Sequence, residues 1–462
     1  MNSPDVAPKR SSRPGRKRRV RCALCGRFAA VRRLVRIDSW PSPQLSLLYF
    51  DLLSRIPELQ PDSLVSVSCL ERAERDLQRR QLVRRNGELR FVDLVFDRGE
   101  ILPTPERIGA STALRGRGVT IAFVDSGFAP HPDLILPRNR VVGAFNAVTG
   151  REAGDFEGDF SEGPPASAWH GTMAAAVAAG SGYLSKGDYR GVASEARLVL
   201  VKGMTPEGRI RTPQVRRALR WILKNHERFG IRIVNLSVGV DESTRSLRHP
   251  VIALVEELVE RGITVVAAAG NNPSRPIVPP GSAPSAITVG GYNDNNSLEW
   301  SDREMWHGSW GGASGGGAQK PELLGPAIYV AAPILLGTQV KSEAETLFWL
   351  AGSSDRDLMG NLPLLAPETG IASPLLKATS PLVARGLVLE RMRSEKLISP
   401  SYKHVDGTSF AAPIVSSIVA QLIEGNPKLT PQEIRATLFA TARRIEGIPE
   451  ELQGYGMVGV RR

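Results

Sequence analysis

The sequence predicts an α/β fold built on a doubly wound, mostly parallel β-sheet, preceded by a small unit of helices and a β-hairpin. From about residue 105 onward, short strand-like runs alternate with helical stretches, the pattern of a parallel sheet with helices on both faces. The strand-like runs are apolar throughout rather than alternating, as expected of strands buried on both faces. The composition, with 42% hydrophobic and 23% charged residues, is that of a globular protein.

Local runs of residues predict the individual elements of this sheet and its helices. The expected strands are short β-favouring stretches: 119–124, 198–201, 231–238, 263–268 and 286–289. The expected helices are 173–179, 213–228, 250–261, 410–423 and a last helix opened by the capping-box sequence Thr430-Pro431-Gln432-Glu433. Ligands of such sheets bind beyond the carboxyl ends of the strands, so residues that follow strands are the first candidates for a site.

The first segment of the chain is strongly basic. Residues 1–36 hold twelve Lys and Arg against one acid, and they account for nearly all of the net charge of +12. Residues 1–38 are therefore expected to be a basic, disordered tail. The remainder of the chain is close to neutral.

Residues 39–104 are expected to form a small domain of their own. Helices are predicted over 44–56 and 68–84, the second with an SxxE capping sequence at Ser68. A hairpin is predicted at Asn86-Gly87. This order of elements resembles a winged-helix domain, which leaves nucleic-acid binding by residues 1–104 open. An appendage that supports the rest of the protein is favoured, because no specific motif accompanies the pattern.

The three cysteines, Cys22, Cys25 and Cys69, do not form a disulfide framework. Cys22 and Cys25 make a CxxC pair that could supply half of a zinc site, but four ligands are needed. With only Cys69 left and no histidine nearby, unligated thiols are favoured, and no metal or other cofactor is expected. The low cysteine count fits a reducing compartment.

No uninterrupted apolar run reaches the roughly 18 residues that span a bilayer, and no secretory signal follows the basic N-terminus. A cytoplasmic protein without a membrane span is expected.

Four polar residues follow or open predicted elements of the sheet domain. Asp125 and Asn271 come directly after apolar strands, while His170 and Ser409 open helices. At a helix start the Ser409 hydroxyl would lie near free backbone N–H groups, which can stabilise an oxyanion. The helix dipole would disfavour the protonated form of His170 and so keep it available as a base. Each residue alone is commonplace, but together they offer a carboxylate, an imidazole, an amide and a hydroxyl.

The motifs around these residues resemble those of the subtilisin-like (S8) peptidases. Asp125-Ser126-Gly127 is similar to the family's D-[ST]-G block, and His170-Gly171-Thr172 to its H-G-T block. Gly407-Thr408-Ser409-Phe410-Ala411-Ala412-Pro413 is similar to its G-T-S-[MF]-[AS]-x-P block, and Asn271 falls on its oxyanion asparagine. The resemblance covers roughly residues 110–445 and implies a sheet of the subtilisin type.

The resemblance also implies a chemistry. Asp125, His170 and Ser409 would form the catalytic triad of a serine endopeptidase, and the Asn271 side chain would hold the oxyanion together with the Ser409 backbone N–H. A protein or peptide substrate would pair as an extended strand with 237–239. The residues expected to bind it are Ser237, Val238, Gly239, Ala268, Ala269 and Gly270, with 278–280 opposite.

Three features depart from the family pattern. Met173 replaces a second histidine after H-G-T, with little expected effect. Residues 338–400 are a predicted insertion that could be a lid, a partner-docking element or an autoinhibitory plug within the peptidase domain of 105–462. Calcium is in doubt, because 182–188 is not Asn-rich, although Asp133 could be one ligand.

Three functional readings follow. The main one is an active endopeptidase, since all triad positions are filled. A second is a catalytically silent scaffold that acts through its N-terminal domain. The third is a latent protease released by a regulatory protein partner, or by processing near residue 105.

Overall fold

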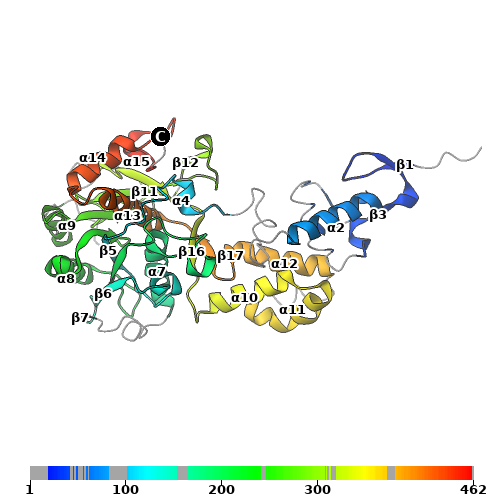
Figure 1. The fold of residues 1–462 in the computed structure, drawn as a ribbon, viewed down its shortest axis with the longest axis horizontal. Helices are drawn as coiled ribbons and strands as arrows, with labels where there is room; N and C mark the ends of the chain where they lie inside the picture. Colours follow the sequence, from blue (N-terminus) through cyan, green and yellow to red (C-terminus); the bar gives the residue numbers. More distant parts are fainter. Residues whose placement is uncertain are drawn as a thin grey trace, which may run out of the picture.

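The computed structural model describes residues 19–41, 62–82, 101–152, 165–240, 248–306, 319–371 and 380–459, with 45, 48–49, 52, 56, 59–60, 246, 308–309 and 312–313. Three bodies follow one another along its long axis: an α/β body, a group of helices, and a small N-terminal unit (Figure 1). The hairpin predicted at Asn86-Gly87 lies outside the described residues.

The α/β body is built on a nine-stranded sheet with the order β12-β11-β10-β9-β5-β8-β6-β7, in which β15 also pairs with β11. All pairings are parallel except those of the edge strands β7 and β12, which confirms the predicted sheet. The bounds are β5 Thr120–Asp125, β6 Val141–Asn146, β7 Arg151–Glu152, β8 Arg197–Lys202, β9 Ile231–Leu236, β10 Thr264–Ala268, β11 Ile287–Asn293, β12 Glu304–Met305 and β15 Leu323–Pro326.

Helices cover both faces of this sheet (Figure 1). Helices α7 (Pro165–Ala179) and α13 (Thr408–Gly425) bury one face, and α8 (Thr212–Phe229) and α9 (Pro250–Glu260) bury the other. Helix α14 (Pro431–Thr441) adds to the first core and begins with the predicted capping box between Thr430 and Glu433. Two separate apolar cores make the sheet doubly wound, as predicted.

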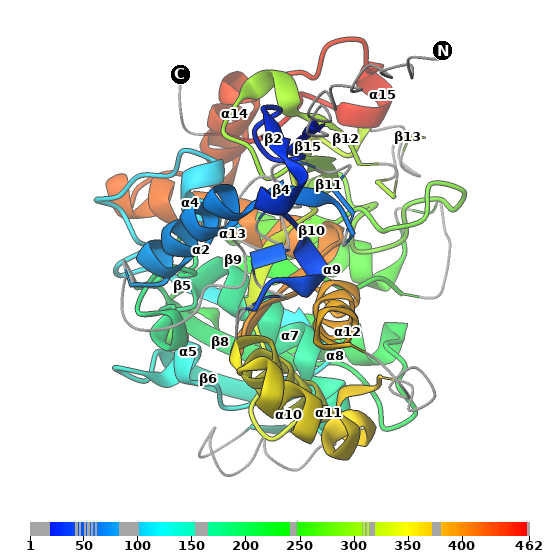
Figure 2. The same cartoon turned by 90° about the vertical axis from the view of Figure 1, so that its right-hand side faces the viewer.

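The predicted insertion forms a three-helix group with its own apolar core (Figure 2). Its helices are α10 (Gln339–Gly352), α11 (Asp355–Thr369) and α12 (Pro381–Ser394). The chain leaves the α/β body after β16 (Val330–Pro333) and returns through β17 (Leu397–Ser399) and β18 (Tyr402–Val405). Strand β16 pairs with β18 in antiparallel fashion, so the insertion starts and ends at neighbouring points.

The expectation of a disordered tail is wrong for residues 19–38. Strands β1 (Arg19–Arg21) and β2 (Phe28–Ala30) form a hairpin, and β3 (Leu34–Arg36) pairs with β4 (Leu64–Ser66). Apolar residues lie among the basic ones, and Cys22, Leu34 and Ile37 are buried in a core shared with α2 (Val67–Leu82).

Helix α2 begins at Val67, so Ser68 lies inside the first turn and is not the cap that the SxxE sequence predicted. Leu382 of α12 is part of the same apolar core, so the N-terminal unit packs against the insertion.

Of the described helices, only α13 is long and apolar enough to cross a bilayer by length and composition. The structure buries 78% of that stretch inside the protein, where it forms the central helix of the sheet's first core. Its apolar character is thereby accounted for by packing.

Candidate active site

Asp125 is the last residue of β5, in the middle of the sheet, with its side chain 1% exposed. Its Oδ1 accepts hydrogen bonds from His170 Nδ1 at 2.7 Å and from the Ser126 backbone N–H at 2.6 Å. Of the donors in the described part of the chain, none reaches Oδ2. Because an ionised carboxylate only accepts, the contact fixes the proton on His170 Nδ1 and leaves Nε2 with a free lone pair.

A close approach of α7 to β5 makes this contact possible. Gly171 follows the histidine, and a Cβ added there would lie 2.2 Å from the Gly127 carbonyl oxygen and 2.9 Å from Asp125 Cβ. Only glycine permits that separation, which explains why an H-G sequence accompanies the histidine. His170 is the sixth residue of α7, not its first, which corrects the prediction that it opens a helix.

The pKa of His170 is also shifted in the direction opposite to the prediction. Burial lowers the pKa of His170, but the charge of Asp125 and the hydrogen bond to it together raise that pKa above the ordinary value of 6.5. The helix-dipole argument predicted a disfavoured imidazolium. The structure reverses it, because a carboxylate 2.7 Å away outweighs partial charges of a helix end more than one turn distant.

Ser409 is the second residue of α13, behind the N-cap Gly407. As a residue of the first turn, its backbone N–H has no intrahelical acceptor and is free to bind an anion. The ring of the next residue, Phe410, lies 5.3 Å from the ring of His170, which brings the serine to the edge of the sheet where His170 lies. Among the described residues no hydrogen bond joins Ser409 Oγ to His170 Nε2. Such bonds commonly tighten only when substrate binds.

Pro413 explains how the Ser409 carbonyl is held. Pro413 is the sixth residue of α13 rather than a first-turn residue, and it has no N–H to donate to the Ser409 carbonyl. The hydroxyl of Ser237, just beyond β9, donates to that carbonyl instead, at 2.8 Å. Asn235 in turn donates to Ser237 Oγ at 2.9 Å, so the end of β9 fixes the start of α13.

Asn271 is oriented by the residue before Ser409. Its Oδ1 accepts hydrogen bonds from the backbone N–H and the hydroxyl of Thr408, at 2.9 and 2.8 Å. The hydroxyl of Thr408 also accepts from Gly270 N–H at 3.1 Å. With its oxygen engaged, Asn271 presents Nδ2 beside Gly407, where an added Cβ would lie 3.2 Å away. The sequence did not reveal this role of Thr408.

The predicted substrate-binding segments lie near one another. Val240 N–H donates to the Pro279 carbonyl at 3.0 Å, so the segment after β9 runs beside 278–280. A Cβ on Gly239 would meet Val278 at 2.8 Å, and one on Gly281 would meet the Ala268 carbonyl at 2.9 Å. These contacts bring 237–239, 268–270 and 278–280 close to one another. Their role in binding substrate stays a prediction.

A cavity of about 610 Å³, which sequence reasoning did not foresee, opens beside His170. One wall comes from α7 and α13, and the other from the segment that enters the insertion after β16. Its residues include Trp169, Met173, Phe410, Leu335, Val340 and, at a polar edge, Lys396 and Asp406, which form an ion pair. Met173, the substitute for a second histidine, is thus part of an apolar wall.

Asp133, suggested as a calcium ligand, is engaged by protein donors. Tyr402 OH donates to its Oδ2 at 2.6 Å and Leu184 N–H to its Oδ1 at 3.3 Å. Burial, followed by the negative charge of Asp133, raises the pKa of Tyr402. Asp133 is fully buried and serves to join α5 (Pro132–Ile135) to β18.

Comparison with known proteins agrees with this geometry. Residues 116–456 match the subtilase family. Serine protease AprX of Bacillus subtilis (strain 168) is 28% identical over 353 residues, which cover 75% of this chain and 66% of that protein. Subtilisin BL of Lederbergia lenta is 30% identical over 185 residues, 40% of this chain and 59% of that protein. The matches span less than two thirds of these relatives.

A solved structure, sphericase, shares the fold. It aligns with a TM-score of 0.53 and 20% identity over 78% of this chain and 99% of its own. At that identity the likeness speaks for the fold alone, whereas the family match covers the sheet, the helices and every predicted catalytic residue. The chain belongs to the subtilase family.

Proposed function

We propose that the protein is a serine endopeptidase that hydrolyses peptide bonds through Asp125, His170 and Ser409. The observation that carries the proposal is the 2.7 Å contact between buried Asp125 and His170, at the edge of the sheet where Ser409 and Asn271 also lie. The carboxylate holds the imidazole in the tautomer whose Nε2 can accept a proton from a nucleophile.

The chemistry runs in two stages. Ser409 Oγ attacks the scissile carbonyl while His170 Nε2 takes its proton, and the imidazolium is stabilised by Asp125. His170 then returns the proton to the leaving amine as the peptide C–N bond breaks, which leaves an acyl-enzyme. Water repeats the sequence and releases the acid product.

The negative charge that forms on the carbonyl oxygen needs donors. Asn271 Nδ2 and the Ser409 backbone N–H supply them, and both are set in place before substrate arrives by Thr408 and by the start of α13. Donors positioned in advance stabilise the transition state without a cost of reorganisation.

The decisive experiment compares the wild-type chain with Ser409→Ala. Both are treated with a fluorophosphonate probe, which labels only an activated serine, and both are incubated with casein. Labelling and cleavage by the wild type, with neither in the variant, is the expected result. If a folded wild-type chain shows no labelling under any condition, the protein is a silent scaffold and the proposal fails.

A second candidate, a latent protease, is favoured by one chain of contacts. The N-terminal core includes Leu382 of α12, and the segment entering the same insertion lines the cavity beside His170. The insertion thus joins the N-terminal unit to the site. Processing near residue 105 is not favoured as the trigger, since Pro105 and Arg107 are buried.

Leu382 offers a test with a matched control. In Leu382→Glu a charge enters the apolar contact, whereas Val383, its neighbour on α12, is 52% exposed and tolerates Glu. If the N-terminal unit restrains the site, Leu382→Glu labels faster with the fluorophosphonate probe than the wild type, while Val383→Glu labels at the wild-type rate. Equal rates in all three would argue against latency of this kind.

A further inference from the structure

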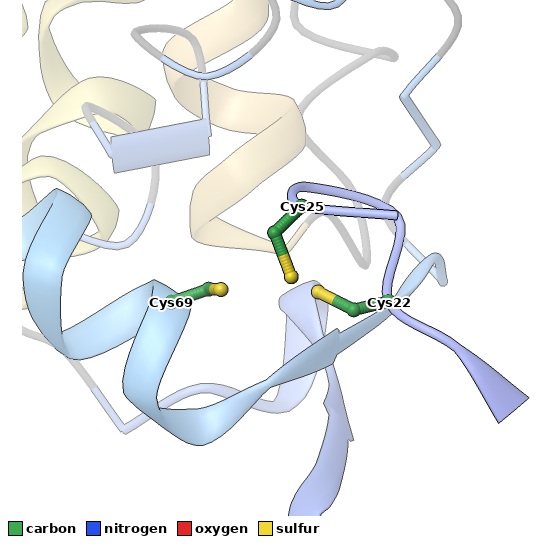
Figure 3. Close-up of side chains that lie close together, drawn as sticks. All are labelled: Cys22, Cys25 and Cys69. Carbon is green, nitrogen blue, oxygen red and sulfur yellow. The ribbon is translucent and has the colours of Figure 1, made fainter. Parts of the chain in front are cut away.

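The three cysteines of the chain meet at one point of the N-terminal unit (Figure 3). Cys22 and Cys25 come from the turn between β1 and β2, and Cys69 from the first turn of α2. Their sulfur atoms lie within 4.8 Å of one another, and all three are free thiols. A tetrahedral zinc ion with Zn–S bonds of about 2.3 Å sets its sulfurs about 3.8 Å apart, so binding one would need only a small contraction.

The turn that carries the first two sulfurs is shaped to present them. Gly26 N–H donates to the Cys22 carbonyl and Cys22 N–H to the Arg27 carbonyl, both at 2.9 Å, which closes a tight loop. Gly26 has φ +67°, a left-handed conformation that glycine adopts without strain. This geometry turns both thiols of the CxxC pair toward the same side.

Backbone N–H groups also surround the Cys22 sulfur. Ser66 N–H donates to it at 3.3 Å, and the N–H groups of Leu24 and Cys25 are directed at it as well. These donors stabilise a thiolate at Cys22, the form in which cysteine binds a metal. Cys69 lies in the first turn of a 16-residue helix, where burial raises the pKa of its thiol.

We propose that Cys22, Cys25 and Cys69 bind one Zn²⁺ as three thiolates, with an oxygen ligand, water or a hydroxyl, in the fourth position. All six histidines of the chain lie at residue 131 or beyond, and no fourth cysteine exists, so sulfur and imidazole are not available to complete the set within this unit. One oxygen that lies close to the sulfurs is Ser66 Oγ, 3.8 Å from Cys22 Sγ.

The metal would join elements that are otherwise held by a small core. The ion ties the β1–β2 turn to the start of α2, across 44 residues of chain, beside the buried Cys22. Small units commonly need such a staple, because their apolar cores contribute little stability. Binding would release up to three protons, so zinc affinity would fall at low pH.

The test uses the full-length chain carrying Ser409→Ala, which cannot digest itself. After dialysis against metal-free buffer, we expect one zinc per chain by mass spectrometry of the metals. X-ray absorption should show three sulfurs at about 2.3 Å and one lighter atom. Thiol-reactive reagent should modify the cysteines slowly until a chelator is added, and rapidly afterwards.

Variants separate a metal site from packed thiols. Cys69→Ser should bind zinc at least about tenfold more weakly, whereas Ser68→Ala, its neighbour in α2, should bind as the parent does. Three freely reactive thiols without zinc, or a Cys22–Cys25 disulfide, would overturn the proposal. The thiol-protection assay needs no variant, so a misfolded Cys69→Ser protein would leave the proposal falsifiable.

Discussion

Asp125 and His170 set the pH range in which the site can act. The pKa of His170 is raised above 6.5, because the charge and hydrogen bond of Asp125 outweigh the effect of burial. A raised pKa stabilises the fold below about pH 6.5 and that contribution is lost as pH rises through the folded pKa. Activity has the opposite sign, since the base must be neutral.

We therefore expect the rate of fluorophosphonate labelling to fall, on acidification, with a midpoint above pH 6.5. In Asp125→Asn the charge is gone, so the midpoint should move to lower pH and the rate should drop by about 10⁴. Labelling rates measured across the pH range report both effects. An unchanged midpoint in Asp125→Asn would contradict the assigned role of Asp125.

Asn271 supplies a donor for charge that exists only in the transition state. Asn271→Ala should lower kcat by about 10² to 10³, a magnitude known from subtilisin, with little change in KM. Asn272→Ala is the matched control, because Asn272 is the exposed neighbour whose Oδ1 accepts from Ser274 N–H instead. Steady-state kinetics on a peptide substrate test the pair. Equal losses in both variants would point to a general disturbance of the loop.

The start of α13 is held by the side chain of the residue that follows β9. Ser237 Oγ donates to the Ser409 carbonyl that Pro413 leaves without a helical partner. Ser237→Ala should lower the free energy of unfolding by about 0.5–1.5 kcal/mol, because a partly buried acceptor loses its partner. Urea unfolding of the variant in the Ser409→Ala background measures this, and a loss below a few tenths would indicate that water replaces the hydroxyl.

How much of these elements the sequence predicts depends on the range of the contacts. The strands, the helices and the four polar site residues follow from local runs and motifs. Two contacts that local runs of sequence do not reveal join residues far apart along the chain. Cys69 meets Cys22 across 47 residues and Cys25 across 44, and Ser237 meets Ser409 across 172. The basic composition of 19–38 also concealed its strands. Charged side chains indicate which positions face solvent, but they do not indicate whether the backbone forms a strand.

At the scale of the whole molecule, a buried ion pair fixes the beginning of the peptidase part to the sheet. The Arg107 guanidinium makes two 2.8 Å bonds to Asp294, just after β11, and donates to the Ile328 and Tyr329 carbonyls. Both side chains of the pair are fully buried. Breaking such a pair leaves an uncompensated charge in the interior.

Asp294→Ala should therefore lower the free energy of unfolding by about 3–5 kcal/mol. Glu450→Ala serves as the control, because Glu450 pairs with Arg444 at a site where both side chains are more than half exposed, and such pairs contribute little. Denaturant unfolding of both variants in the Ser409→Ala background makes the comparison. Similar midpoints would mean that Arg107 finds other partners.

The antiparallel pairing of β16 and β18 has a consequence for how this protein can change. Pro333 lies opposite Tyr402, so the segment between these two residues leaves the α/β body and returns to it at neighbouring points. A short turn in place of the insertion could connect the two strands without altering their register. This connection point lies beside the cavity next to His170. Evolution or engineering can therefore replace the inserted helices with another module at this point and so change how substrates reach the site.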